Sequence, residues 1–257
     1  DTDSYFICDL RDIDDNYIGE IKKKCTAFIL FDDLGIKKVH PDILINPTPF
    51  CYDGYNKSEY PETTLLLGEK FFFIRPDFVD KSYIMDFQKE KYSVIASFGG
   101  ADPLNITEFF IQTISPRLSA HNISVVLGTA YAKKDEVIEK YKGRRNIRFF
   151  TQVFPLDGMF LSHDIAFVCA GDTCIEACRS GIATFIISSI YYEKKFGQLL
   201  HEKGMACFVA DIEDIKGGKF LHNYLTVFEN REMLMRHSRC GMTLIEAKCL
   251  ERIYRII

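Results

Sequence analysis

From residue 92 onward, runs of apolar and β-branched residues alternate with stretches long enough to form helices. The apolar runs lack the polar alternation of a half-exposed strand, so each is expected to be covered on both faces, as in a parallel sheet. Strands linked by helices in this way predict a doubly wound α/β sheet with right-handed crossovers. The expected strands span residues 92–98, 123–128, 147–150, 165–170, 184–189 and 206–210, and the expected helices span 107–118, 133–141, 156–161, 173–180, 196–203 and 219–228.

The first 85 residues hold fewer elements. One clear helix is expected at residues 14–24, and strands are expected at 4–9, 27–32, 43–46 and 65–68. These elements make about half of a second α/β domain, too few for a complete sheet. A polar stretch with a proline break suits a linker, and helical spacing resumes beyond Arg231. We therefore expect a first domain over residues 1–85, a nucleotide-binding domain over 91–237 and a final helix within 238–257 that packs back on the first domain.

The composition and charge of the chain argue against some classes of binding partner. The chain has 257 residues, 47% of them hydrophobic, and a formal net charge of −4. An acidic balance argues against nucleic acid or an anionic membrane surface as the main partner, and no apolar run approaches the ~20 residues of a membrane span. The nine cysteines include no CxxC pair, which argues against a zinc ribbon and a thioredoxin-type motif, and a reducing cytoplasm is the expected location. No cofactor and no metal ligands are assigned. The trio Cys169, Cys174 and Cys178 either forms a metal or redox site or is buried and structural.

A double glycine follows the first strand of the regular region. Residues 97–102 read Ser-Phe-Gly-Gly-Ala-Asp, and a helix is expected shortly after them. In open α/β sheets, ligands bind beyond the carboxyl ends of the strands. Paired glycines there let backbone N–H groups approach an anion. Gly99 and Gly100 therefore predict either a phosphate-binding loop or a simple turn between strand and helix.

A second glycine, Gly171, stands between the fourth expected strand of this region and its helix. Asp172 or Thr173 would cap that helix, whose N-terminal amides and dipole favour a phosphate. Glu176 falls about one turn into the helix, where its carboxylate can accept hydrogen bonds from a ribose diol. A capped helix with a solvated glutamate is the alternative. Two such loops at adjacent strand ends favour a nucleotide diphosphate, and Gln198, after the next strand, would add a polar contact near them.

Several catalytic motifs are absent from the sequence. It contains no GxxxxGK[ST], no GxGxxG after a strand, no HExxH and no GxSxG. Their absence argues against P-loop hydrolysis, standard dinucleotide redox chemistry, zincin proteolysis and serine esterase chemistry.

Polar residues end three strands of the front half. Asp9 follows the first strand, and the pair Asp32-Asp33 follows the second, where it would face any cleft between the domains. Paired carboxylates can do acid–base work when their pKa values separate. A turn that leads into Gly35 is the alternative for this pair. Asn46 closes the next strand, either as a turn former or as a sugar ligand.

Taken in order, these motifs resemble a known family. They are similar to the UDP-sugar hydrolase of pseudaminic acid biosynthesis and its spore-coat polysaccharide biosynthesis relatives, and more distantly to the N-acetylglucosaminyltransferase of peptidoglycan synthesis. The likeness spans essentially the whole chain. The residues that carry it are Asp9, Asp32-Asp33, Leu44-Ile45-Asn46, Leu67-Gly68, Phe73-Ile74-Arg75 with Phe78, Gly99-Gly100-x-Asp102 with Asn105, Gly171-x-Thr173-x-x-Glu176, and Gln198.

The resemblance implies a glycosyltransferase-B architecture of two Rossmann-like domains, with UDP or a UDP-sugar held mainly on the C-terminal one. It also implies a substrate site on this chain. The implied ligands are Gly99, Gly100, Asp102 and Asn105 at the nucleotide-sugar cleft, Gly171, Asp172 and Thr173 at the diphosphate, Glu176 at the ribose, Gln198 and Asn46 as polar contacts, and the backbone of residues 152–154 at the uracil.

One departure from the family concerns catalysis. The family's first domain opens with a Gly-x-Gly-His loop whose histidine is the expected base, and this sequence has no such loop. The N-terminal domain is therefore expected to be incomplete, with a missing front segment or a partner subunit supplying the rest. The catalytic residues stay unassigned, with Asp9, Asp32 and Asp33 as cleft residues.

These observations predict a UDP-sugar hydrolase that releases UDP in nonulosonic-sugar or surface-polysaccharide biosynthesis. A glycosyltransferase that uses the same UDP-sugar site is one alternative. A nucleotide-sugar binding module or subunit without catalysis of its own is the other.

Overall fold

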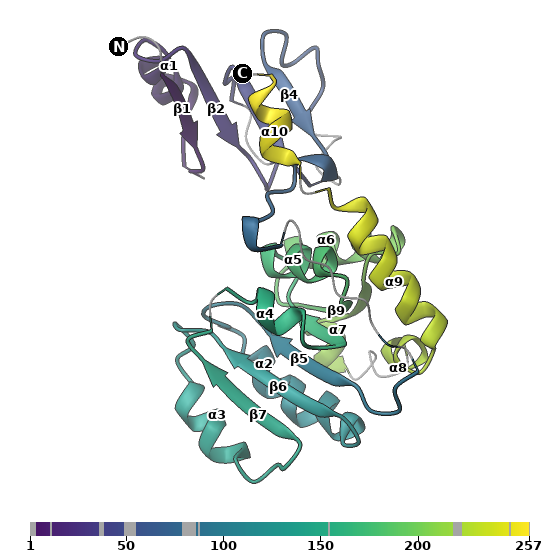
Figure 1. Ribbon diagram of the computed structural model, residues 1–257. Coiled ribbons are helices and arrows are strands. Elements are labelled where there is room, and N and C mark those ends of the chain that lie inside the picture. The colour runs from purple at the N-terminus through teal and green to yellow at the C-terminus, as the bar shows by residue number, and fades with distance from the viewer. Residues whose placement is uncertain are drawn as a thin grey trace. The chain divides into compact units, whose positions relative to one another are not determined.

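The computed structural model describes residues 4–10, 12–35, 39–48, 55–78, 86, 88–153, 155–217, 223–246 and 248–256. The chain divides into two compact units (Figure 1). Unit 1 comprises Asp1–Phe73 and Glu246–Ile257, and unit 2 comprises Ile74–Ile245. Each unit is built on its own parallel sheet, which confirms the predicted α/β class.

Unit 2 contains a six-stranded parallel sheet with the strand order β10-β9-β8-β5-β6-β7. From its first strand, β5, the order runs one way to β7 and the other way to β10, as in doubly wound nucleotide-binding sheets. Every strand lies within about two residues of its predicted position. The strands are β5 (Ser93–Ser97), β6 (Asn122–Leu127), β7 (Ile147–Thr151), β8 (Ile165–Val168), β9 (Ala183–Ser188) and β10 (Cys207–Asp211).

Helices cover both faces of this sheet. On one face, Val94 and Val125 pack in the main core with Phe110, from the helical segment after β5. On the other face, α6 lies so close that a Cβ on Gly197 would meet the side chain of Ile186 at 2.9 Å. Burial from both sides explains why the strands show no polar alternation. The helices of unit 2 are α2 (Ile106–Phe109), α3 (Lys134–Tyr141), α4 (Asp157–Phe160), α5 (Asp172–Ser180), α6 (Tyr191–Glu202), α7 (Ile212–Gly217), α8 (Asn223–Phe228) and α9 (Arg231–Leu244).

The helical segment after β5 differs from the single helix expected over residues 107–118. It begins as α2, continues as a π-helical turn over Phe110–Ile114 and ends as a 3-10 turn over Ser115–Leu118. Pro116 lies in the last turn and has no amide hydrogen to donate back along an α-helix. The chain therefore changes its helical pitch in this region.

Unit 1 contains a four-stranded parallel sheet with the order β1-β2-β3-β4. The predicted strands and the predicted helix of this region are all present. Asp14 caps the helix, because its side chain accepts a hydrogen bond of 2.8 Å from the amide of Tyr17. The elements are β1 (Tyr5–Cys8), α1 (Asp15–Lys22), β2 (Ala27–Phe31), β3 (Ile43–Asn46) and β4 (Thr64–Leu67).

The core of unit 1 is formed by segments from the beginning and the end of the sequence. On one face of the sheet, Ile18 of α1 packs with Phe28. On the other face, Cys249 and Ile253 of α10 (Cys249–Tyr254) pack with Ile43 and its neighbours (Figure 1). The last helix therefore completes the core of the unit that contains the first strands.

Gly128 follows β6 and lies against the loop after β5. A Cβ at this position would lie 2.2 Å from the carbonyl oxygen of Gly100 and 2.4 Å from that of Gly99. These are backbone atoms, so an added methyl group must displace the loop itself. We expect Gly128→Ala to lower the free energy of unfolding, measured by urea denaturation, by about 1–3 kcal/mol.

Gly143→Ala is the matched control, since a Cβ there would meet no heavy atom within 4 Å. Its free energy of unfolding is expected to stay level or to rise by about 0.5 kcal/mol, because alanine restricts the unfolded chain. Equal stability of the two variants would contradict the close packing at Gly128.

Candidate functional site

The strand order of unit 2 reverses between β5 and β8, which pair in parallel. From β5 the chain continues to β6 on one side, and from β8 it continues to β9 on the other. Doubly wound sheets bind ligands beyond the carboxyl ends of the strands at this point of reversal. The two glycine loops singled out in the sequence are the loops that follow β5 and β8.

In the loop after β5, the backbone N–H groups point away from Gly128, which follows the neighbouring strand β6. The carbonyl oxygens of Gly99 and Gly100 lie against Gly128, and the oxygen of Gly100 accepts a hydrogen bond of 3.0 Å from the amide of Ala130. In a planar trans peptide the C=O and the next N–H point in opposite directions. The N–H groups of Gly100 and Ala101 therefore point away from Gly128, and within the described part of the chain no acceptor receives a hydrogen bond from them.

Gly99 itself has a φ of 84°, a left-handed conformation that glycine adopts without steric cost. A Cβ on Gly99 or on Gly100 would meet no heavy atom within 4 Å. Among the described residues, none crowds the backbone on the open side of this loop, which suits the approach of a ligand.

Asp102 and Asn105 hold this loop in place with the side chains that the resemblance assigned to substrate. The buried carboxylate of Asp102 accepts hydrogen bonds of 2.8 Å from the amides of both Ile106 and Thr107, and so caps α2. Asn105 accepts a hydrogen bond from the hydroxyl of Tyr131. Both residues have positive φ, 40° for Asp102 and 59° for Asn105.

Glu108 is the centre of a polar network beside this loop. Its carboxylate accepts hydrogen bonds from Lys140 Nζ at 2.6 Å, from Asn105 Nδ2 at 2.7 Å and from the Tyr141 hydroxyl at 3.1 Å. The hydrogen bond from Lys140 is the largest of the effects that lower the pKa of Glu108 to about 2. The network ties the start of α2 to α3.

The loop after β8 leaves the start of α5 without a capping side chain. Gly171 is the N-cap in an extended conformation, and its carbonyl oxygen accepts a hydrogen bond of 2.9 Å from the amide of Cys174. The prediction that Asp172 or Thr173 caps the helix is wrong, because both residues lie inside its first turn. Their amides donate to no acceptor among the described residues, so the positive end of the helix dipole faces outward.

Glu176 forms a bidentate ion pair with Arg75, which lies 101 residues earlier in the chain. Arg75 Nε is 2.5 Å from Glu176 Oε1, and Arg75 Nη2 is 3.0 Å from Oε2. The Glu176 side chain is 8% exposed. Burial raises the pKa of Glu176, and the guanidinium opposes the rise. Arg75 is not among the site residues predicted from the sequence, although the motif that contains it contributes to the family resemblance.

Gln198 lies farther from the strand ends than expected. The carboxylate of Glu193 accepts hydrogen bonds from the amide and the hydroxyl of Ser189, both at 2.7 Å, and so closes the turn from β9 into α6. The helix therefore begins at Tyr191 and not at residue 196. Gln198 is exposed and lies about 10 Å along the helix from its first residue.

Asp32 and Asn46 of unit 1 form hydrogen bonds with other residues of the same unit. Asp32 Oδ1 accepts a hydrogen bond of 3.0 Å from the amide of Gly35, and Oδ2 accepts one of 2.9 Å from the hydroxyl of Tyr55. Asn46 is fully buried, donates to Tyr55 at 3.0 Å and accepts from the amide of Thr48 at 2.7 Å. Asp32 and Asn46 therefore act as turn formers at the carboxyl end of the sheet.

Asp9 and Asp33 end the first two strands of unit 1 at this same edge. Asp9 is exposed, and Asp33 is half-buried with its carbonyl oxygen accepting a hydrogen bond of 3.0 Å from the Thr48 hydroxyl. The parallel pairing of β1 with β2 puts the two residues on neighbouring strand ends.

The remaining sequence candidates lie elsewhere in unit 2. Cys174 and Cys178 are buried, and Cys169 is half-buried. The hydrogen bond with Cys178 and burial raise the pKa of Cys174, and burial raises that of Cys169. Such thiols are structural. Gln152, which follows β7, has a φ of 59°, and Phe154 lies outside the described residues.

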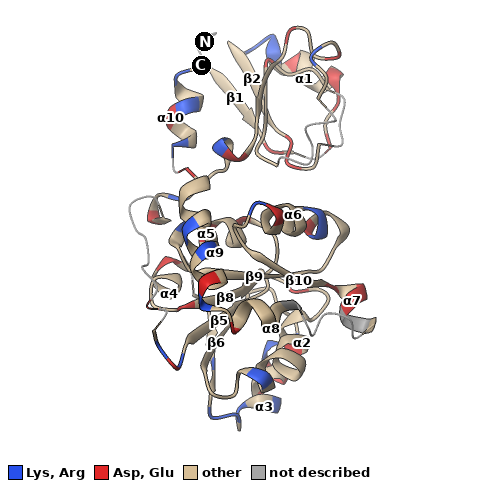
Figure 2. Cartoon of the chain, turned by 90° about the vertical axis from the view of Figure 1, so that its right-hand side faces the viewer, with Lys and Arg blue, Asp and Glu red and all other residues tan. Residues whose placement is uncertain are grey.

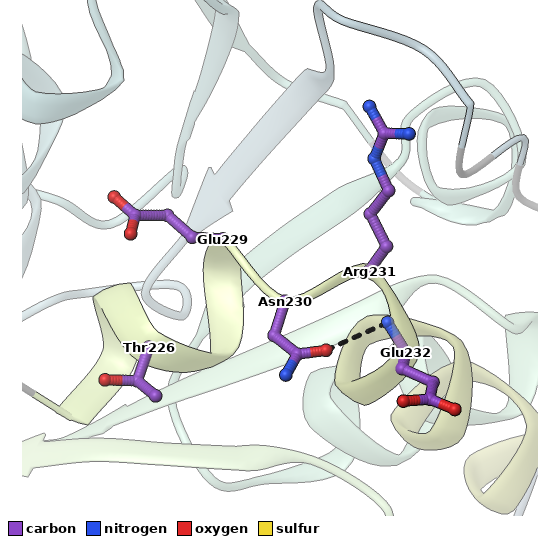
Figure 3. Close-up of a pocket in the computed structure, with 5 residues that line it drawn as sticks. All are labelled: Thr226, Glu229, Asn230, Arg231 and Glu232. Carbon is purple, nitrogen blue, oxygen red and sulfur yellow. Dashed lines mark hydrogen bonds between the residues drawn. The ribbon is translucent and has the colours of Figure 1, made fainter.

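A shallow hollow of about 590 Å³ lies where α8 meets α9 (Figure 3). Its side chains do not converge: those of Glu229 and Arg231 point in different directions, and Asn230 is used as the N-cap of α9. The amide of Glu232 donates to Asn230 at 3.0 Å. This hollow therefore lacks the convergent polar groups of a ligand site.

Comparison with known proteins identifies the fold. No protein-family profile matches the chain. Among curated proteins, uncharacterized protein MJ1062 of Methanocaldococcus jannaschii is 23% identical over 194 residues, which cover 70% of this chain and 39% of that protein. The chain therefore spans well under half the length of this relative.

Solved glycosyltransferases share the architecture at low identity. MurG of Acinetobacter baumannii is 10% identical with a TM-score of 0.58, over 90% of this chain and 66% of that one. The pneumococcal O-GlcNAc transferase GtfA, in complex with UDP and GlcNAc, is 11% identical with a TM-score of 0.60, over 94% and 54%. The rhamnosyltransferase SpnG, complexed with thymidine diphosphate, is 12% identical with a TM-score of 0.54, over 93% and 75%.

The chain has the fold of these glycosyltransferases. Two parallel α/β sheets, one of four strands and one of six, match the glycosyltransferase-B architecture that the resemblance implied. Among the described residues, no helix is long and apolar enough to cross a membrane. Basic and acidic residues are interspersed along both units (Figure 2).

Glu108→Gln tests the network beside the loop. The pKa of Glu108 is about 2 in the folded protein against a usual value of 4.5, so the ionised carboxylate stabilises the fold above pH 4.5. We expect the variant to be less stable than the wild type by about 1–2 kcal/mol at pH 7. The difference should shrink as the pH falls from 4.5 towards 2, as measured by chemical denaturation at each pH. A difference that is independent of pH would show that Glu108 does not carry this charge.

Proposed function

We propose that unit 2 binds a nucleoside diphosphate sugar at the loops after β5 and β8, as part of a glycosyltransferase. The observation that supports this most strongly is the set of amides at the point of strand reversal. Gly100 and Ala101 on one loop, and Asp172 and Thr173 on the other, have no acceptor among the described residues. Backbone amides and a helix N-terminus at one sheet edge are the usual means of binding a diphosphate.

The two loops divide the ligand between them in this proposal. The diphosphate lies at the start of α5, against Gly171 and the amides of Asp172 and Thr173. The sugar lies towards Gly99 and Gly100, where a Cβ would meet no protein atom. Such amides also stabilise the charge that grows on the diphosphate as the sugar departs, because they are already oriented before the reaction.

Glu176 is the proposed ribose ligand. It lies about 6 Å along α5 from the first residue of the helix, which is a suitable distance from a diphosphate at the N-terminus. Arg75 orients its carboxylate by the bidentate ion pair. Asp102 and Asn105 act here by positioning the loop, because their side chains bond to protein groups.

The nucleotide is proposed to be UDP. GtfA is described in complex with UDP and GlcNAc, and SpnG with thymidine diphosphate, so two proteins of this fold bind pyrimidine diphosphates. Both are named as transferases, as the structural neighbours generally are. We therefore propose transfer to an acceptor, in place of the hydrolysis expected from the sequence.

Gly171→Val tests the diphosphate site. A Cβ at Gly171 would meet no protein atom within 4 Å, and the backbone there is extended, so the fold accommodates the change. The added side chain would occupy space that the diphosphate needs. We expect the affinity for UDP, measured by isothermal titration calorimetry, to fall at least about tenfold while the melting temperature stays the same.

Gly143→Val is the control for this experiment, because a Cβ at Gly143 also meets open space and the residue lies after α3. Its affinity for UDP should equal that of the wild type. If the wild type binds neither UDP nor thymidine diphosphate, or if both variants lose affinity alike, the site is misplaced.

The type of reaction is tested by product analysis. Incubation with UDP-sugars in water alone should release UDP slowly, and a sugar acceptor should accelerate the release. Rapid formation of free sugar without an acceptor would show hydrolysis and would overturn transfer as the proposed reaction.

A further inference from the structure

A polar cavity lies at the opposite end of the same sheet. It has a volume of about 420 Å³ and is lined mainly by residues at the beginnings of β5, β6 and β7 and by the segment between α4 and β8, with Met159 of α4 and Phe150 farther along β7. Asn122 is the first residue of β6, Asn146 directly precedes β7, and His163 lies two residues before β8. The strands that lead to the glycine loops, β8 with four residues and β5 with five, separate this end from those loops by roughly 13–17 Å. The cavity is therefore distinct from the proposed nucleotide site.

The floor of the cavity is the sheet face turned away from the main core. Ser124 and Arg148 are direct partners in the pairing of β6 with β7. Their neighbours Ile123 and Ile147 belong to the main core, so Ser124 and Arg148 project from the other face. Both residues line the cavity.

His163 is a neutral part of this floor. Its Nδ1 lies 2.7 Å from the carbonyl oxygen of Met159, and its Nε2 lies 2.8 Å from Ser124 Oγ. A carbonyl oxygen can only accept, so Nδ1 carries the hydrogen and Nε2 accepts from the serine hydroxyl. Burial lowers the pKa of His163, which keeps the ring uncharged at neutral pH.

The charge of the cavity comes from two arginines. Arg145 and Arg148 are exposed, and neither guanidinium makes a hydrogen bond or an ion pair with a described residue. By contrast, Arg144 next to them donates to the carbonyl oxygen of Ile111 at 2.7 Å. No carboxylate is among the described residues that line the cavity.

The nearest acidic residue in the sequence is already satisfied. Asp164 is buried, with Oδ1 2.8 Å from Lys89 Nζ and Oδ2 accepting a hydrogen bond of 2.7 Å from the amide of Ser93. Its charge is therefore balanced by Lys89, which does not line the cavity, and by the amide of Ser93, which does. The two guanidinium groups are left as an uncompensated positive pair over a polar, neutral floor.

We propose that this cavity is a second ligand site of unit 2, which binds a small phosphorylated molecule. The guanidinium groups of Arg145 and Arg148 hold the phosphate, since their planar forks match its oxygens. The side-chain amide of Asn122 and the Oδ1 of Asn146 face the polar remainder of the ligand, while Asn146 Nδ2 donates to the carbonyl oxygen of His121 at 3.3 Å. A volume of about 420 Å³ lies within the usual range of small-molecule sites and admits a phosphate with one sugar ring.

Calorimetry with glucose 6-phosphate as the probe tests this site on the intact chain. Arg148→Gln should weaken the affinity at least about tenfold, because a charge-assisted bidentate contact is lost. The matched control is Arg239→Gln, which removes the same charge from an exposed position on α9 outside the cavity. That variant should bind within about twofold of the wild type. Unchanged melting temperatures confirm that both variants are folded.

Three further arms separate the alternatives. Saturating UDP should leave the affinity for glucose 6-phosphate unchanged, whereas displacement by UDP would place the phosphate at the glycine loops and overturn the proposal. Inorganic phosphate should bind more weakly than glucose 6-phosphate, and equal affinity would overturn the contact to the polar remainder. Equal losses in Arg148→Gln and Arg239→Gln, binding of glucuronate as tight as that of the phosphate, or no binding of glucose 6-phosphate would also overturn it.

Discussion

The contact between Gly128 and the carbonyl oxygens of Gly99 and Gly100 is the constraint on which the candidate site depends. It fixes the direction of two peptide planes, and through them the direction of the amides of Gly100 and Ala101. Asp102, which caps α2, fixes the other end of the loop. The amides are therefore oriented by packing on the sheet side of the loop, before any ligand arrives.

Much of the fold could be predicted from the sequence, because the pattern that marks it has one physical cause. A strand covered on both faces is apolar over most of its length, and β8 and β9 are buried at every position, with Thr184 and Ser188 as the polar exceptions. The glycine loops were equally visible, since Gly99 takes a φ that disfavours side chains. Hydrophobic periodicity and glycine positions are local features of the sequence, and local features are enough to predict the strands and the glycine loops.

The roles of the polar residues could not be predicted in the same way. An aspartate after a strand can cap a helix, form a turn or meet a ligand, and the residue type does not distinguish these. The carboxylates of Asp102 and Asp32 accept hydrogen bonds from nearby backbone amides. The ion pair of Glu176 with Arg75 joins residues 101 positions apart, and hydrophobic periodicity cannot predict such a long-range contact. Gln198 lies farther from the strand ends than the sequence predicts, because the contact between Glu193 and Ser189 starts α6 at Tyr191.

The two units differ in the number of chain segments that form them. Unit 2 is one continuous stretch, whereas unit 1 joins Asp1–Phe73 to Glu246–Ile257. During synthesis from the N-terminus, every strand of unit 1 leaves the ribosome well before Cys249 and Ile253, the residues that cover one face of its sheet. Unit 2 can thus complete its core first, although its sequence comes later. The order in which the two cores can be completed is therefore opposite to the order in which the two units begin in the sequence.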